Sequence, residues 1–170
     1  MFPTGDFDRL KYEIMEWYDD VNIPITFGIL IADYEQSLAR EYILNYMDVF
    51  DNLSNTYIDF FIPGYTIYGS NDDIRTSMRN KDGATYYFSR KLFTDFIEKF
   101  ESLFDYEYGF SPVLLLVELK NRNFTGTKKI VIELDTEAFN IKKAGILFKS
   151  IFNIAKQYVN ILDYSSVLYR

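Results

Sequence analysis

Apolar residues follow two different spacings along this chain, and the changes of spacing predict its helices and strands. Two nearly continuous apolar runs, 23–32 (IPITFGILIA) and 113–119 (VLLLVEL), are typical of strands buried on both faces. Shorter apolar runs at 57–62 and 130–134 indicate two further strands. Apolar residues at helical spacing predict helices at 6–18, 35–50, 90–104 and 141–162.

The connections between these elements predict how the strands pair. The order strand, helix, strand over 23–62, with short links, forms a βαβ unit whose two strands run parallel through a right-handed crossover. The loop at 121–127 is too short for a crossover helix, so 113–119 and 130–134 are expected to pair antiparallel. We therefore predict an α/β fold in a single domain over 1–170. Its central mixed sheet has about four main strands flanked by helices, and the 6–18 helix precedes it.

Residues 63–88 form an irregular insertion after the second strand. Pro63-Gly64 ends that strand, and turn signals follow at 69–73 and at Asp82-Gly83. The segments 65–68 and 84–88 each have the composition of a short strand. We expect the insertion to contain a hairpin.

Polar residues at element ends indicate helix starts. Pro3 and Thr4 stand before the first predicted helix as start signals. Asp33 follows the first strand and can cap the next helix, with Gln36 as its capping-box partner. Ser89 is the expected N-cap of the 90–104 helix.

The element order β-α-β-α-β-β-α resembles that of the thioredoxin-like fold superfamily. In that family a βαβ half is joined by a helix to a ββα half, whose first strand follows a cis proline. Ser111-Pro112 stands at that place before VLLLVEL, and the resemblance covers about 22–162, with 63–88 inserted. The family's CxxC motif would fall where this chain reads Asp33-Tyr34-Glu35-Gln36. The resemblance thus implies a redox-inactive member that is used for binding.

Two absent residue types restrict the chemistry. The chain has no cysteine and no histidine. Thiolate catalysis, disulfides and Fe–S clusters are therefore excluded, as are the commonest general base and the usual zinc ligand. No cofactor or metal is expected. We expect a cytoplasmic protein with no membrane span, for three reasons. The chain has no cysteine, its charged N-terminus does not look like a signal peptide, and it has no apolar run of about 18 residues.

Charge is concentrated in the first third of the chain. The net charge is −7, whereas the first 60 residues hold twelve acidic and three basic residues, which is −9. Such a balance argues against nucleic-acid binding, which needs a basic footprint. The acidic third either faces a basic partner or is a solvated surface.

The insertion contains the best candidate ligand site. Aromatic rings and guanidinium groups can stack on a base and grip a phosphate or a carboxylate. The alternative is a hairpin that covers the sheet edge with its tyrosines packed flat. The candidate ligand-binding residues are Tyr65, Tyr68, Arg75, Arg79, Tyr86 and Tyr87.

A catalytic alternative uses Asp105, Glu118 and Lys120. Glu118-Leu119-Lys120 looks like the E-x-K part of PD-(D/E)xK nucleases, in which two acids hold Mg²⁺ and the lysine steadies water or phosphate. Charged residues at a strand end are common, however, and that family places a helix after this strand. The net charge of −7 is a further objection.

The sequence as a whole favours a non-catalytic binding module of bacterial or phage origin. Its expected partner is a protein or a small anionic or aromatic ligand. The apolar C-terminal tail, 160–170, is expected to pack on the domain or to dock a second copy as a homodimer.

Overall fold

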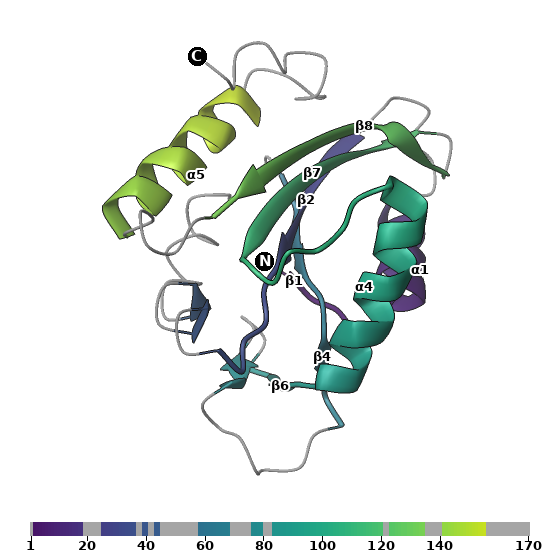
Figure 1. Ribbon diagram of the computed structural model, residues 1–170, viewed down its shortest axis with the longest axis vertical. Coiled ribbons are helices and arrows are strands. Elements are labelled where there is room, and N and C mark those ends of the chain that lie inside the picture. The colour runs from purple at the N-terminus through teal and green to yellow at the C-terminus, as the bar shows by residue number, and fades with distance from the viewer. Residues whose placement is uncertain are drawn as a thin grey trace.

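The computed structural model describes residues 2–18, 25–36, 39–40, 43–44, 58–68, 76–79, 83–120, 123–134 and 141–155. These parts form an α/β arrangement in which a five-stranded mixed sheet lies between helices, beside a smaller three-stranded sheet (Figure 1). The predicted α/β class with a mixed central sheet is therefore confirmed.

The five-stranded sheet combines a parallel and an antiparallel half. Its strands lie in the order β1 (Phe2–Pro3), β3 (Phe60–Ile62), β2 (Ile25–Ile31), β7 (Val113–Lys120) and β8 (Asn123–Glu133). β1, β3 and β2 are parallel, whereas β7 is antiparallel to both β2 and β8. Both predicted pairings are present. β1 adds an edge strand that the sequence pattern did not indicate.

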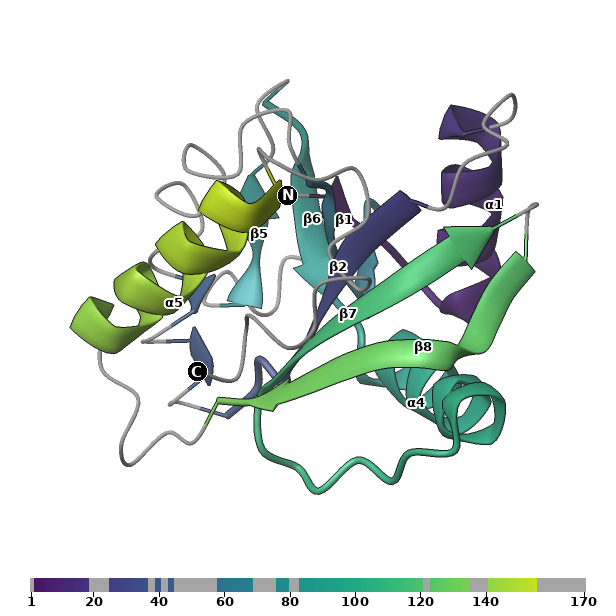
Figure 2. The ribbon, with the colours of Figure 1, turned by 90° about the horizontal axis from the view of Figure 1, so that it is seen from above.

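Alternating residues of β2 send their side chains to two different cores. Phe27, Ile29 and Ile31 face the layer formed by α1 (Phe7–Trp17) and α4 (Arg90–Phe104). Leu30 lies in the opposite core, which α5 (Ile141–Ala155) covers with Phe148 and Ile151 (Figure 2). Burial on both faces explains why this strand reads as a continuous apolar run.

The helices that cover the first face begin at their caps. Ser89 Oγ accepts from the backbone N–H of Leu92 at 3.4 Å, and α4 spans the predicted 90–104. Asp6 Oδ1 accepts from the N–H of Arg9 at 2.9 Å, so the N-cap is Asp6 rather than Pro3 or Thr4, and α1 starts at Phe7, within one residue of the predicted start. Pro3 instead belongs to β1, and the backbone N–H of Thr4 continues that pairing by donating to Ile62 O at 2.9 Å.

The insertion forms a three-stranded sheet that contains the expected hairpin, the antiparallel pair of 78–79 with 85–88. β4 (Tyr65–Thr66), β6 (Thr85–Phe88) and β5 (Met78–Arg79) lie in that order and pair antiparallel. The small sheet is joined to the N-terminal segment because the N–H of Tyr65 donates to Thr4 O at 2.8 Å. The N–H of Gly64 likewise donates to Gly5 O at 2.9 Å.

Several predicted bounds change. The predicted loop 121–127 is wrong, because β8 begins at Asn123 and pairs from there, with a register shift opposite Glu118 that absorbs the extra residues. Among the described residues of the expected 35–50 helix, 35–36 lie in a turn or bend, 39–40 are helical, 43 lies in a turn and 44 is 3₁₀-helical; the others lie outside the described ranges. Residues 156–162 of the last predicted helix and the tail, 160–170, also lie outside the described ranges.

Two further observations complete the fold. No described peptide bond is cis, so Pro112 precedes β7 in the trans form. Within the described ranges, no helix has the length and apolarity that crossing a membrane requires.

Candidate functional site

A closed ionic cluster occupies the carboxyl end of β2, where the sequence resemblance would place a redox motif. Arg90, the first residue of α4, directs Nη2 to both oxygens of Asp33 at 3.0 and 2.9 Å. The same guanidinium reaches Glu35 Oε2 with Nε at 2.7 Å and with Nη2 at 2.5 Å. Asp33 also accepts from the N–H of Glu35 and from Gln36 Nε2, so the expected Asp33–Gln36 contact is present. Every oxygen of the buried Asp33 carboxylate therefore has a donor.

Two buried tyrosines lie beside this cluster. Tyr34 is fully buried, its ring 5.7 Å from that of Tyr65 and 5.8 Å from that of Phe88. Burial raises the pKa of Tyr34 well above its ordinary value. Burial, followed by the charge of Asp33, raises the pKa of Tyr108 to about 12. Neither phenol can therefore act as a base near neutral pH, and Asp33 is held by Arg90, so the cluster has the character of a structural junction.

A pocket of about 390 Å³ lies where the start of α1 meets the small sheet. We call it the tyrosine pocket. It is lined by Pro3, Thr4, Gly5, Asp6, Arg9, Glu13, Tyr65, Thr66, Ile67, Tyr68, Tyr86 and Leu92. Its volume falls within the range of ligand sites.

The polar groups of the tyrosine pocket are incompletely paired. Glu13 Oε1 accepts from Arg9 Nε at 2.6 Å, but the buried Oε2 has no hydrogen-bond partner. Thr4 is 2% exposed, and its Oγ1 also has no partner. Unpaired buried polar atoms are rare in folded proteins, because each loses its contact with water without compensation. Two of them lining one pocket indicate a place for a ligand.

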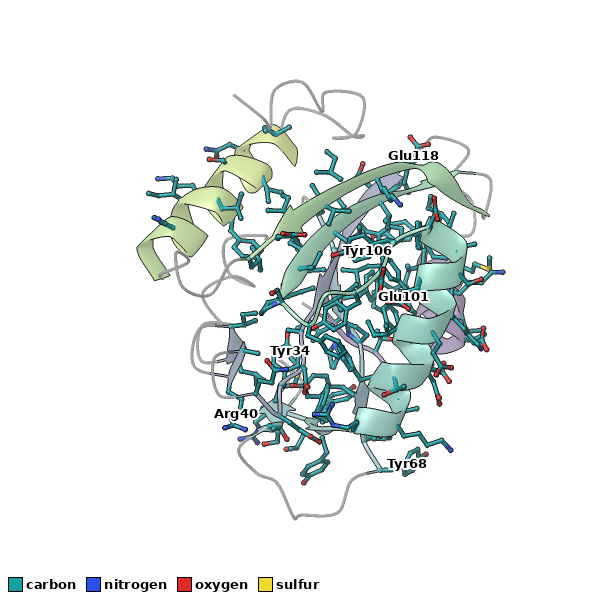
Figure 3. The ribbon with its side chains drawn as sticks, in the orientation of Figure 1. Tyr34, Arg40, Tyr68, Glu101, Tyr106 and Glu118 are labelled. Carbon is teal, nitrogen blue, oxygen red and sulfur yellow. The ribbon has the colours of Figure 1, made fainter. Side chains whose placement is uncertain are left out.

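The apolar side of the pocket has a fixed floor and an exposed rim. Tyr65 is buried and its hydroxyl donates to Thr76 O at 3.0 Å, which holds the ring in place. Tyr68 is 87% exposed and Ile67 is 53% exposed. Figure 3 shows Tyr68 projecting at one end of the molecule, near the start of α4. An exposed aromatic next to an exposed aliphatic side chain is typical of a contact surface.

The structure brings together half of the predicted ligand-binding residues. Tyr65, Tyr68 and Tyr86 line the tyrosine pocket, whereas Tyr87 and Arg79 do not. Arg79 Nε instead donates to Gly83 O at 3.1 Å, which ties it to its own turn. Arg75 lies outside the described residues.

Sequence reasoning missed the polar wall of the pocket, formed by Thr4, Arg9 and Glu13. The acidic character of the first 60 residues was the one signal that pointed to this segment. No sequence pattern showed that the segment lies against Tyr65.

The residues of the catalytic alternative do not converge. Glu118 lies on β7 between Val117 and Leu119, which both face the α1–α4 layer, so its buried side chain belongs to the α5 side of the sheet. Asp105 ends α4 on the opposite side, and its backbone oxygen accepts from Lys129 Nζ at 3.1 Å. Carboxylates that share a metal ion must each approach it to about 2–2.5 Å. The sheet separates these two.

The remaining features of that alternative add no site. The side chain of Lys120 lies outside what the structure describes. In the described part of the chain, no group of three or more acidic side chains is placed to hold a metal ion. Figure 3 shows Glu118 at the end of the molecule opposite to Tyr68.

A second pocket, of about 500 Å³, lies between α1 and α4. It is lined in part by Asp8, Lys99 and Phe124, and Asp8 forms an ion pair with Lys99 across it. None of the unpaired buried polar atoms found in the described residues belongs to this pocket. The tyrosine pocket is therefore the stronger candidate.

Comparisons with known proteins give no further assignment. No protein-family model matches the chain, and neither the curated proteins nor the solved structures contain a match.

Proposed function

We propose that this chain is a redox-inactive binding module on a thioredoxin-like scaffold, which recognises a partner protein through the tyrosine pocket. The scaffold part of the proposal is supported by the parallel β3–β2 pair, the antiparallel β7–β8 pair and the position of Pro112 directly before β7. Pro112 is trans, unlike the family's proline, so the likeness depends on the order and direction of the strands.

The position of the family's redox motif supports binding rather than catalysis. Asp33 and Glu35 stand there without any thiol, and Arg90 occupies both carboxylates. A nucleophile needs a free reactive atom and a nearby base. This cluster offers neither, so the scaffold at this point serves to fix the end of β2 to the start of α4.

One observation carries the binding function: two residues that line the tyrosine pocket each carry a buried polar atom without a partner, beside an exposed aromatic rim. A folded chain gains nothing from leaving Thr4 Oγ1 and Glu13 Oε2 unpaired, whereas a bound partner would pair them. The exposed Ile67 and Tyr68 extend the contact beyond the pocket itself. Aromatic side chains of this kind commonly supply most of the affinity of a protein interface.

The test is affinity capture from a native lysate with matched baits, read by quantitative mass spectrometry. The wild-type chain is compared with Tyr68→Asp and with the control Phe110→Asp, since Phe110 is also an exposed aromatic, at 73%, but lies outside the pocket. We expect a partner that the wild type and Phe110→Asp retain equally and that Tyr68→Asp loses at least tenfold. Capture that is equal for all three baits, or capture of no partner, would contradict the proposal.

A further inference from the structure

We infer that the tyrosine pocket receives a cationic side chain, the guanidinium or ammonium group of an arginine or lysine in the partner. This inference rests on the proposed function and names the chemistry that the pocket recognises.

The first argument is the half-paired carboxylate of Glu13. One oxygen is occupied by Arg9, while Oε2 is buried in a lining residue of the pocket without a donor. A carboxylate oxygen only accepts hydrogen bonds, and the groups that satisfy it best are charged donors. A guanidinium or ammonium group entering the pocket supplies such a donor.

The second argument is the net charge of the pocket. Its charged lining residues are Asp6, Glu13 and Arg9, which sum to one negative charge, and Arg9 is already paired with Glu13. Arg79, which sequence reasoning offered as an anion-binding group, lies outside the pocket and is bonded to Gly83. An anion would meet two carboxylates and one engaged arginine, so a cation is favoured.

The third argument is the remainder of the lining. Thr4 Oγ1 is a buried, unpaired atom that can accept a hydrogen bond from an N–H group. The face of an aromatic ring attracts a cation, as that of Tyr12 does for Arg9 at 5.6 Å, and three tyrosines, Tyr65, Tyr68 and Tyr86, line the pocket. Carboxylate, hydroxyl and aromatic faces together suit a long side chain with a charged end.

The charge of the surrounding segment acts in the same direction. The first 60 residues carry a net charge of −9 and supply Thr4, Asp6, Arg9 and Glu13 to the pocket. A field of one sign raises the association rate of an oppositely charged partner. We therefore expect the partner segment to be basic.

The inference is tested by NMR titration of the ¹⁵N-labelled chain with four small probes: N-acetyl-arginine amide, N-acetyl-lysine amide, the neutral N-acetyl-citrulline amide and N-acetyl-glutamic acid amide. We expect saturable shifts at Thr4, Glu13 and Tyr68 with the two cationic probes, and at least tenfold weaker binding of the citrulline probe. Saturation by the acidic probe, equal binding of citrulline, or shifts spread over the whole acidic surface would overturn the inference.

A matched pair of variants locates the charge that matters. Glu13→Gln is expected to weaken the arginine probe at least tenfold, whereas Glu107→Gln removes one exposed charge outside the pocket and should leave it unchanged. The probe series with the wild-type chain decides the question even where Glu13→Gln does not fold. Equal binding by both folded variants would overturn the role of Glu13 and with it the inference.

The two proposals fail in different ways. The cationic inference alone is overturned if a partner is captured through Tyr68 but arginine amide does not displace it and Glu13→Gln does not weaken its capture. Absence of any Tyr68-dependent capture overturns the proposed function.

Discussion

The chain contains two arginine–carboxylate arrangements of similar composition, and they differ in whether they are complete. At the end of β2, Arg90 satisfies Asp33 and Glu35, and backbone and amide donors occupy what remains of Asp33. On α1, Arg9 satisfies one oxygen of Glu13 and leaves the other buried and unpaired. The first arrangement joins two elements of the fold, whereas the second is where we propose that a cation of the partner binds.

The difference shows how a structural charge is distinguished from a binding charge. Asp33 is almost fully buried, and its partners are built into the fold. Glu13 is also mostly buried, but its pairing is left unfinished at a surface pocket. A count of ion pairs would treat the two carboxylates alike. Asking whether each carboxylate oxygen has a donor separates them.

The largest expected effect comes from opening the complete arrangement. Arg90→Met leaves the buried Asp33 without a cationic partner and should lower the free energy of unfolding by about 2 kcal/mol, less than for a fully buried pair because the Arg90 side chain is half exposed. Urea denaturation measures the change. Lys91→Met is the control, since it removes an exposed charge one residue away and should cost under about 0.5 kcal/mol. Equal losses in both variants would show that the network is not structural.

Alkaline pH should act on the same end of the molecule. Burial beside Asp33 raises the pKa of Tyr108 to about 12, above the ordinary value near 10, so the folded state holds the proton more tightly than the unfolded chain does. The contribution of Tyr108 to stability is therefore constant below about pH 10 and is lost as the pH rises from 10 to 12. Thermal unfolding at stepped pH measures this, and Tyr108→Phe should flatten the profile. An unchanged profile in that variant would assign the loss to other tyrosines.

The unpaired hydroxyls of Tyr34 and Thr4 should differ in their importance for binding. Tyr34→Phe and Thr4→Val each remove a buried oxygen without a partner, and each should stabilise the fold by about 1 kcal/mol. Only Thr4→Val should also weaken the arginine probe, because Tyr34 lies outside the tyrosine pocket. Denaturation combined with the NMR titration checks both expectations. A destabilised Thr4→Val would mean that this hydroxyl has a partner within the fold.

The smallest expected effect comes from the incomplete arrangement. Arg9 is 59% exposed, and exposed pairs four residues apart on a helix contribute roughly 0.3–0.5 kcal/mol, so Arg9→Met should change stability by less than about 1 kcal/mol. The substitution also frees Glu13 Oε1, the oxygen that Arg9 occupies, so binding of arginine amide should tighten severalfold. Weaker binding of the probe would show that Arg9 holds the ligand rather than competing with it.

Much of the fold follows from local pattern. The buried runs 23–32 and 113–119 predicted β2 and β7, because strands covered on both faces have no polar side. Ser89 and the phenylalanine face of 90–104 predicted α4 with both bounds correct. β1 was not predictable, since two residues carry no periodicity and their pairing with β3 spans about sixty residues of sequence.

The tyrosine pocket depends on that unpredictable pairing. Tyr65, Tyr68 and Tyr86 stood out in the sequence because aromatic residues are dense there. Thr4 and Glu13 line the same pocket because the N-terminal segment pairs with β3 through β1. Arg79 was a reasonable candidate by composition, but its turn at Gly83 directs it elsewhere. Arg90 was hidden for a similar reason: the capping signal of Ser89 showed where α4 begins, but not that Asp33 lies against it.

The wall of the tyrosine pocket that carries Thr4 is held in place by the short β1 strand. A two-residue strand and a few backbone contacts hold the wall that carries Thr4, so this wall frays more readily than the strands behind it. Without residues 2–5 the pocket would lose Thr4 and the backbone hydrogen bonds that this segment makes with Ile62, Gly64 and Tyr65. The proposed recognition thus depends on a segment, 2–5, that contributes no residue to either buried core.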